Sequence, residues 1–370
     1  MKVDFFSFHY APEELRKRWS EKISTTIQDG QFIGGPHVDQ FEAAWSEFTQ
    51  SKYSVGVSNG FDALVLALKS LNIEKGDFVA LPAHTFIATW NAVISIGAVP
   101  IGIDVDADGL LDLNEFQEVI EKFPIRAVIP VHMHGSTVDI RTLSNICNNE
   151  SKYGKVYIVE DASQAHGAKN TDGSHLGKYS DLVAYSLYPT KNLGALGDAG
   201  IITTDDNQRA LKLRSLRSYG SKPENKYFHE ELGFNNRLDP IQATILTENL
   251  QFLTEWNEVR IMLSNRYISA LESHIPIMQR ARKDSVRHHL CIKSTKRDEL
   301  RKFLLTNGIS TESHYPRVAG KEAMKFLGLE ADFRNSEEIA KTTLSLPLSQ
   351  WHSTKQIDYV VSVLQTWRES

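Results

Sequence analysis

The sequence predicts an α/β fold whose large domain is a doubly wound, mostly parallel sheet covered by helices on both faces. Between about residues 50 and 205, short apolar runs alternate with helical patterns, and this order of elements is typical of parallel sheets. Beyond that stretch, a long helical pattern precedes short strands and helices, which predicts a smaller C-terminal α/β domain. We therefore divide the 370 residues into a large domain, 1–245, and a small domain, 246–370.

The individual elements follow from apolar runs and from their spacing. The predicted strands are 53–57, 78–81, 99–103, 127–132, 156–159, a run that begins near 181, 201–204 and 287–292. The predicted helices are 62–68, 85–96, 113–122, 240–267 and 296–307. Gly97 ends the second helix, and apolar residues at helical spacing, from Ile241 to Leu253, support the long one.

Composition excludes several classes of function. With 41 basic and 46 acidic residues, the chain has a formal charge of −5, which gives no electrostatic reason to expect nucleic acid or an anionic membrane as a partner. Cys147 and Cys291 lie far apart, so a disulfide framework and a zinc ribbon are excluded. No apolar run is long enough for a signal peptide or a membrane span. We therefore expect a cytoplasmic protein.

One loop combines a lysine with regularly spaced glycines. Lys191 follows a predicted strand and precedes Gly194, Gly197 and Gly200, after which another strand begins. The glycines have the spacing GxxGxxG and lead into a strand, whereas those of a Rossmann phosphate loop open a helix, so that loop is excluded. The lack of Gly-Lys-Ser/Thr excludes a Walker A loop. Two interpretations remain. The lysine is held at the sheet edge beside a ligand that the glycines admit, or it is a surface lysine in a glycine turn.

Two further signals lie at the ends of predicted strands. Glu160 and Asp161 end a buried strand, where open α/β sheets bind ligands, although such an acid can also cap the segment that follows. Ser58, Asn59 and Gly60 separate a strand from a helix, so they bind an anion or simply start the helix. A lysine, an acid and a helix N-terminus together meet the needs of a pyridoxal phosphate enzyme for a Schiff base, a protonated pyridine nitrogen and a phosphate site.

Motifs spread over nearly the whole chain carry a family resemblance. They are FIGGP at 32–36, AHTFIAT at 83–89, VEDASQAHG at 159–167, YPTKNLG at 188–194, GFNNRLD at 233–239 and HYP at 314–316. Together they resemble the DegT/DnrJ/EryC1/StrS family of sugar aminotransferases. The resemblance implies fold type I of the pyridoxal phosphate enzymes, with pyridoxal 5′-phosphate as the cofactor.

The resemblance also implies a role for each matched residue around the cofactor ring. Lys191 would form the Schiff base and move the proton between the substrate α-carbon and the cofactor. Asp161 would pair with the pyridinium nitrogen. Gln164 would reach the ring hydroxyl, and Phe86 would stack on the pyridine face.

The resemblance places the cofactor phosphate between two subunits. Gly60 and Phe61 would bind it with backbone amides, Ser186 with its hydroxyl, and Asn235 of the partner subunit would complete the site. This last contact implies a homodimer with shared active sites. The residues that we expect at the substrate are His84, Tyr188, Tyr219, His314 and Tyr315.

Departures from the family pattern bear on the substrate. Phe61 stands where many relatives carry threonine, and with residues 191–200 and 217–221 it resembles the branch that aminates C3. This implies transfer from L-glutamate to the C3 keto group of a dTDP-linked 3-keto-6-deoxyhexose, for a surface polysaccharide, with a C4-keto sugar as the alternative. Dehydrating relatives carry histidine at this position, so Lys191 argues against dehydration. A non-catalytic, cofactor-binding regulator remains a further alternative. His132 and His134 lack a third ligand nearby, so no metal is expected.

Overall fold

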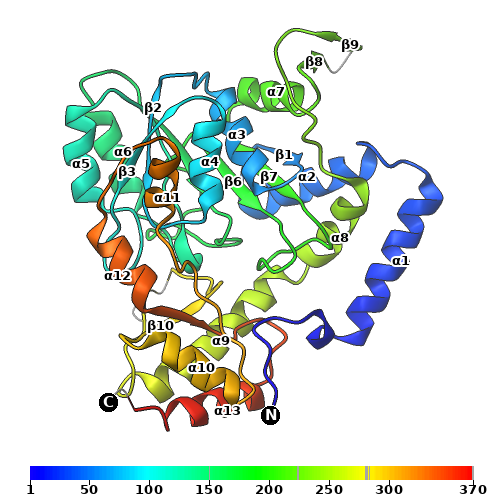
Figure 1. The fold of residues 1–370 in the computed structure, drawn as a ribbon. Coiled ribbons are helices and arrows are strands. Elements are labelled where there is room, and N and C mark those ends of the chain that lie inside the picture. Colours follow the sequence, from blue (N-terminus) through cyan, green and yellow to red (C-terminus); the bar gives the residue numbers. More distant parts are fainter. Residues whose placement is uncertain (150, 223–224, 280–281, 283, 369–370) are drawn as a thin grey trace.

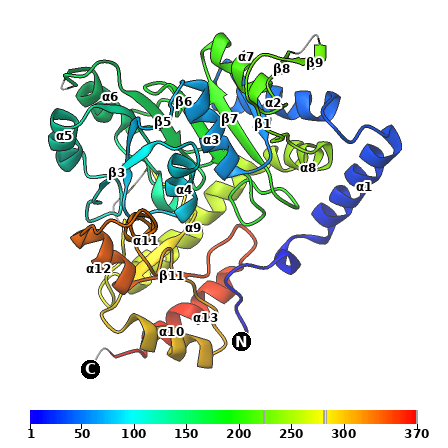
Figure 2. The same ribbon diagram turned by 45° about the horizontal axis from the view of Figure 1, so that its top comes forward.

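The structure, a computed structural model, describes residues 1–370 except 150, 223–224, 280–281, 283 and 369–370. Its central strands are β1 (Tyr53–Val57), β2 (Phe78–Pro82), β3 (Val99–Ile103), β4 (Ile125–Val128), β5 (Tyr157–Asp161), β6 (Leu182–Ser186) and β7 (Gly200–Thr204). They form a seven-stranded sheet in the order β1-β7-β6-β5-β4-β2-β3 (Figures 1 and 2). Strand β7 is antiparallel to β1 and β6, and the neighbours from β6 to β3 pair in parallel. The prediction of a mostly parallel sheet is confirmed.

Helices cover both faces of the sheet. They are α2 (Pro36–Thr49), α3 (Gly60–Ser70), α4 (Ile87–Ser95), α5 (Leu113–Lys122), α6 (Ile140–Asn149), α7 (Asn207–Leu216) and α8 (Pro240–Leu250). Successive residues of a strand point to opposite faces, so Leu182 and Ala184 pack with α3 and α7, whereas Val183 and Tyr185 pack with α2 and α8. The strands are largely apolar because both faces are buried, and the doubly wound architecture is confirmed.

A second core lies in the C-terminal part. The other α-helices and strands of the described residues are α1 (Glu13–Asp29), β8 (Ser221–Lys222), β9 (Asn225–His229), α9 (Leu253–Leu271), β10 (Leu290–Lys293), α10 (Arg297–Thr306), α11 (Ala319–Phe326), α12 (Arg334–Thr342), β11 (Thr343–Leu346) and α13 (Thr354–Leu364), and two short 3-10 helices lie at Phe8–Tyr10 and Met133–Gly135. Strands β10 and β11 pair antiparallel and share an apolar cluster with α9, α10, α13 and Val3. Both chain ends therefore lie in this part of the molecule (Figure 1). The division at residues 245 and 246 stays a prediction, and it falls within α8.

The predicted single helix over 240–267 is wrong. Helix α8 ends at Leu250, and α9 begins at Leu253. Between them, Phe252 stacks its ring on Trp256 with the centroids 5.8 Å apart, and both rings join a cluster that includes Trp19. The apolar spacing continues across the break because both helices bury a face, so periodicity alone does not reveal it.

Three predicted boundaries are also corrected. Strand β4 ends at Val128 instead of continuing to 132, because Pro130 has no N–H to donate to a neighbouring strand. Strand β10 begins at Leu290 instead of 287, because Arg287 has a φ of 52°, which lies outside the strand region. Helix α4 begins at Ile87, two residues later than predicted.

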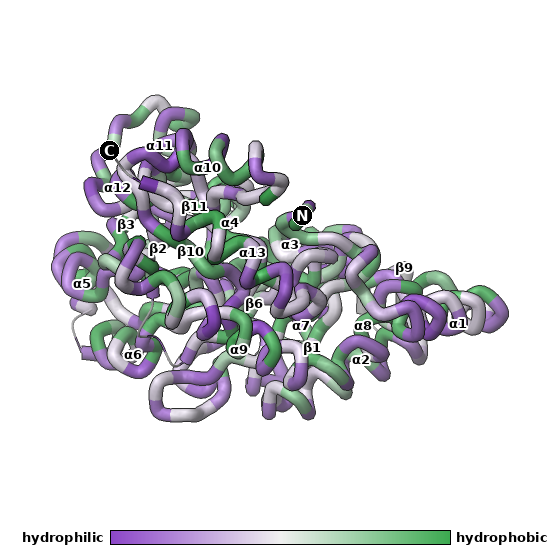
Figure 3. Tube along the Cα trace, turned by 90° about the horizontal axis from the view of Figure 1, so that it is seen from below, coloured by the Kyte–Doolittle hydropathy of each residue, from purple (hydrophilic) through white to green (hydrophobic). Residues whose placement is uncertain are grey.

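The outer helices have one buried and one exposed face. In α5, Phe116 and Ile120 are buried, whereas Glu118 and Glu121 are exposed. Hydrophilic and hydrophobic residues accordingly alternate along such helices (Figure 3), as in other amphipathic surface helices. In the part of the chain that the structure describes, no helix has the length and apolar character needed to cross a membrane.

Candidate active site

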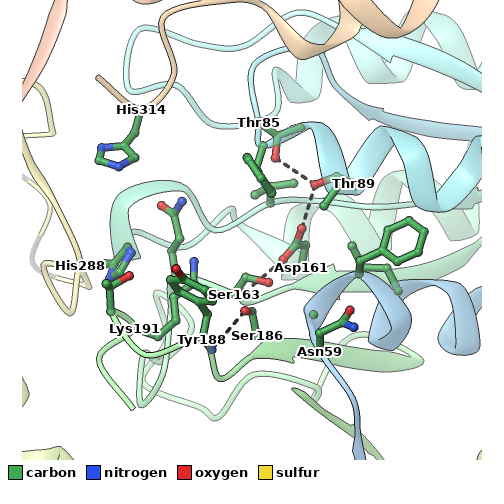
Figure 4. A pocket seen from close by; sticks show the side chains of 18 of the residues that line it. Asn59, Thr85, Thr89, Asp161, Ser163, Ser186, Tyr188, Lys191, His288 and His314 are labelled. Atoms are coloured by element: carbon green, nitrogen blue, oxygen red, sulfur yellow. Dashed lines mark hydrogen bonds between the residues drawn. The ribbon is translucent and has the colours of Figure 1, made fainter. Parts of the chain in front are cut away.

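A cavity of about 660 Å³ opens at the carboxyl ends of the parallel strands (Figure 4). Asp161 and Ser186, the last residues of β5 and β6, line it together with Lys191 from the loop after β6. His314 and Tyr315 from the C-terminal part line the opposite wall. Ligands of open α/β sheets bind in this position.

The carboxylate of Asp161 is fixed in its orientation. The Thr89 hydroxyl donates to Oδ2 at 3.0 Å, and the Ser163 backbone N–H donates to Oδ1 at 3.1 Å. Thr89 lies in the first turn of α4, and its hydroxyl is 3.0 Å from that of Thr85. Asp161 is only 5% exposed. These hydrogen bonds hold a carboxylate at the cavity wall, where it can bind a cationic group of a ligand.

Lys191 lies in a tight turn that directs it into the same cavity. Its backbone N–H donates to the Tyr188 carbonyl at 2.9 Å. Gly194 is required by the turn, because a Cβ there would lie 2.3 Å from the Pro189 carbonyl oxygen. Burial lowers the pKa of Lys191 to about 8, although the charge of Asp161 acts in the opposite direction. A larger fraction of the amine is therefore neutral near pH 7 than in an ordinary lysine, which suits a nucleophile.

The N-terminus of α3 lies against Ser186. Asn59 caps the helix by accepting a hydrogen bond from the Asp62 N–H at 2.9 Å. At Gly60, an added Cβ would lie 2.5 Å from Cβ of Ser186, so only glycine allows this approach. The first-turn N–H groups and the Ser186 hydroxyl consequently converge, and such a helix end attracts anions. The arrangement suits a phosphate group.

Gln164 and Tyr315 connect the sheet to the C-terminal part. The amide oxygen of Gln164 accepts from the His134 N–H at 2.6 Å, and its amide nitrogen donates to the Tyr315 hydroxyl at 3.0 Å. The Tyr315 ring packs on Phe86, with centroids 5.4 Å apart, and its backbone N–H donates to His84 at 3.3 Å. One tyrosine thus orients several groups around the cavity.

The model of the DegT/DnrJ/EryC1/StrS aminotransferase family matches residues 13–365. The chain belongs to this family. It is 36% identical over 376 residues to the dTDP-3-amino-3,4,6-trideoxy-alpha-D-glucose transaminase of Streptomyces venezuelae, an alignment that covers 100% of this chain and 97% of the relative.

Solved structures of aminotransferases share the fold of this chain. The Streptomyces venezuelae DesV structure in complex with a ketimine intermediate superimposes with a TM-score of 0.92 at 36% identity, covering 100% of this chain and 99% of that one. The Bacillus subtilis NtdA structure with bound cofactor PMP superimposes with a TM-score of 0.90 at 29% identity, covering 98% and 84%. The chain is therefore an aminotransferase of fold type I.

Most residues predicted for the site of this aminotransferase share the one cavity. They are Gly60, Phe61, Phe86, Asp161, Gln164, Ser186, Tyr188, Lys191, His314 and Tyr315. His84 does not line it, because it is fully buried behind Tyr315. Tyr219 also lies outside its own chain's cavity, because its N–H is bound to the Phe234 carbonyl and its ring lies 5.5 Å from the Arg237 guanidinium carbon. Asn235 is exposed and outside this cavity as well.

Several cavity residues were not predicted. Thr89, Ser163, His288 and His289 line the wall of the cavity. Thr85 precedes α4 and Thr89 lies in its first turn, and their four-residue spacing, which on the predicted helix over 85–96 places both on one side, could have indicated Thr89. Nothing in the local sequence indicates the two histidines, because only the tertiary fold brings them to the strand ends.

The two histidines considered as metal ligands have separate environments. His132 Nε2 lies 2.8 Å from a carboxylate oxygen of Glu160, and both side chains are fully buried. The ring of His134 instead lies beside Cys291, whose Sγ is 3.7 Å from Nε2. His132 and Glu160 therefore support the strand end that carries Asp161, whose carbonyl accepts from the His132 N–H at 3.0 Å.

Proposed function

We propose that the enzyme transfers an amino group from L-glutamate to the C3 keto group of a dTDP-linked 3-keto-6-deoxyhexose. The product would be a dTDP-3-amino-3,6-dideoxyhexose for a surface polysaccharide. Pyridoxal 5′-phosphate is the cofactor. The convergence of Lys191, Asp161 and the N-terminus of α3 on one cavity carries the proposal for the chemistry. The name of the Streptomyces relative, a dTDP-3-amino sugar transaminase, supports the substrate.

The described residues fit this cofactor. When bound, pyridoxal phosphate supplies an aldehyde that bonds to an amine and a pyridine ring that withdraws electrons from the substrate carbon. Because residue 60 is glycine, the N-terminus of α3 can lie against Ser186, so first-turn N–H groups and the Ser186 hydroxyl are close enough together to bind one phosphate. Lys191 has an amine with a lowered pKa, as attachment to an aldehyde requires.

Each side chain then has a distinct task. Lys191 holds the cofactor and, once released, takes and returns the proton at the substrate α-carbon. Asp161, oriented by Thr89, keeps the ring nitrogen protonated by offering it a negative charge. Gln164 holds the ring hydroxyl, and Phe86 covers one face of the ring.

The proposal includes a homodimer in the cytoplasm. Asn235 of the partner subunit would complete the phosphate site, as its exposed position in this chain allows. Large apolar side chains at Phe32, Ile33 and Leu232 are 49%, 60% and 88% exposed, and a subunit interface would bury such residues. The free, buried cysteines Cys147 and Cys291 are compatible with a reducing compartment.

Capture of pyridoxal phosphate by cofactor-free protein is expected to depend on pH through Lys191. Only the neutral amine attacks an aldehyde, and the pKa of Lys191 is about 8. The rate constant, followed by stopped-flow absorbance, should rise about tenfold per pH unit below pH 8 and level off above it. A simple amine of ordinary pKa is the control, and its rate constant should continue to rise above pH 8.

Because the charge of Asp161 raises the Lys191 pKa, Asp161→Asn should move the plateau to lower pH. A wild-type rate constant that still climbs tenfold per pH unit above about pH 9 would contradict the assignment.

The position of amination is tested by offering two sugars separately. Purified enzyme receives L-glutamate with either the 3-keto or the 4-keto dTDP-6-deoxyhexose, and 2-oxoglutarate is measured. We expect turnover of the 3-keto sugar to exceed that of the 4-keto sugar by at least about 100-fold, because the pocket must place one carbonyl carbon at the reacting nitrogen. Turnover of the 4-keto sugar alone would overturn the position while leaving the enzyme class intact.

A further inference from the structure

His288 is a residue of the cavity wall to which the proposed chemistry gives no task. It lies beside Lys191 (Figure 4), lines the cavity and is 4% exposed. Its backbone carbonyl accepts a hydrogen bond from the buried Arg260 guanidinium at 3.2 Å, and its ring Nδ1 lies 2.9 Å from Oδ1 of Asn192. Backbone and ring are therefore both held in place.

A chain of hydrogen bonds determines which ring nitrogen of His288 carries the proton. The carbonyl of His166 can only accept, so the amide nitrogen of Asn257 faces it, at 2.8 Å. The amide oxygen of Asn257 accepts from Asn192 at 2.8 Å, and the same Asn192 nitrogen donates to the Val286 carbonyl at 3.0 Å. The Asn192 oxygen is left to face His288, so His288 Nδ1 is the donor and carries the proton.

The other ring nitrogen, Nε2, is the acceptor of a side chain that lines the cavity. Burial lowers the pKa of His288 well below its ordinary value, and the charges of Lys191 and Arg260 lower it further. A neutral imidazole protonated on Nδ1 has a lone pair on Nε2. Within the described residues, no donor makes a hydrogen bond to this nitrogen. Because His288 lines the cavity, a donor group of a bound ligand can approach this lone pair.

The two substrates of the proposed reaction differ in what they offer to this acceptor. Glutamate has one donor group, the amine that reacts, and its two carboxylates carry only acceptor oxygens, which a bare Nε2 repels. A hexose presents hydroxyl groups that donate. His289 and His314 continue the wall as a stacked pair, with ring centroids 3.8 Å apart and planes 14° from parallel, so the sugar would lie along a wall of imidazoles.

We propose that His288 is a specificity-determining residue whose Nε2 accepts a hydrogen bond from a hydroxyl group of the hexose. The inference rests on the sugar substrate of the proposed function. It assigns Nδ1 and Nε2 different tasks: Nδ1 holds the ring through Asn192, and Nε2 recognises the substrate.

Two variants separate these tasks. His288→Asn places an amide nitrogen near the position of Nδ1 and removes the acceptor, whereas His288→Gln places an amide oxygen near the position of Nε2. The two half-reactions are followed separately through the cofactor absorbance. For His288→Asn we expect kcat/KM with the sugar to fall about tenfold, as for one lost hydrogen bond, with the loss confined to the sugar half-reaction. His288→Gln should recover at least half of that loss on a logarithmic scale.

Deoxy analogues of the sugar test the same contact from the side of the substrate. Removal of one hydroxyl should cost the wild-type enzyme about tenfold in kcat/KM and cost His288→Asn almost nothing. Equal losses in both half-reactions, no loss, or no deoxy sugar that costs the wild-type enzyme more than His288→Asn would overturn the inference. Should His288→Asn fail to fold, a wild-type enzyme that loses nothing with any deoxy sugar still overturns it. If the wild-type enzyme turns over no nucleotide-linked keto sugar at all, the proposed function fails, which is a different result.

Discussion

Replacing Lys191 with alanine is expected to lower the turnover number by about 10³-fold or more, the scale on which a positioned proton-transfer group acts. The same change should remove the visible absorption band of bound cofactor. Both effects follow because one amine, in a turn that Gly194 permits, attaches the cofactor and moves the proton. The measurements are the absorption spectrum of the purified variant and the rate of 2-oxoglutarate formation.

Lys191→Arg is the matched control for this prediction. The guanidinium preserves the positive charge beside Asp161 but stays protonated and cannot bond to an aldehyde. It should therefore lose the band and the activity as alanine does. Retention of both by either variant would show that Lys191 is not the attachment site.

Replacing Asp161 with asparagine is expected to lower kcat by about 10²–10³-fold, as for the loss of one preorganised electrostatic group. The cofactor should stay bound, because Lys191, Ser186 and the N-terminus of α3 are unchanged. The fall in kcat is expected because the neutral amide of asparagine cannot hold a proton on the pyridine nitrogen as the carboxylate does. Steady-state kinetics and the cofactor content after gel filtration measure the two effects.

Thr89→Val provides a graded comparison for Asp161. It removes the 3.0 Å hydrogen bond to Oδ2 but leaves the carboxylate and its bond from the Ser163 N–H. A loss of about tenfold in kcat is expected, because one hydrogen bond to a charged group contributes about 1.5 kcal/mol. If Asp161→Asn cost no more than Thr89→Val, the charge of Asp161 would not be the decisive property.

The central fold is predictable from sequence because its signals are local. Strands β1 and β3 and helix α5 have the predicted bounds, since each combines an apolar run or period with a clear stop. The errors arise where backbone geometry overrides hydropathy. Pro130 ends β4 early, the φ of Arg287 delays β10, and the turn at Phe252 divides one apolar period into two helices.

The site is predictable to the extent that its residues lie in contiguous motifs at strand and helix ends. Asp161 and Lys191 are examples, and the family resemblance added Phe86 and Gln164 by position. The hydrogen bond from Gln164 to Tyr315 joins residues 151 positions apart, so no local pattern indicates it. His288 escaped prediction for the same reason: its chemistry depends on Asn192, 96 positions earlier.

Reduction with borohydride followed by peptide mapping tests the central claim most directly. The reagent traps an aldehyde that is bonded to an amine, so the modified residue can be identified by mass spectrometry. We predict that the pyridoxyl group is found on the peptide that contains Lys191, and that it is lost when glutamate is added before reduction. A pyridoxyl group on another lysine, or none on any peptide, would contradict the assignment of this cavity as the active site.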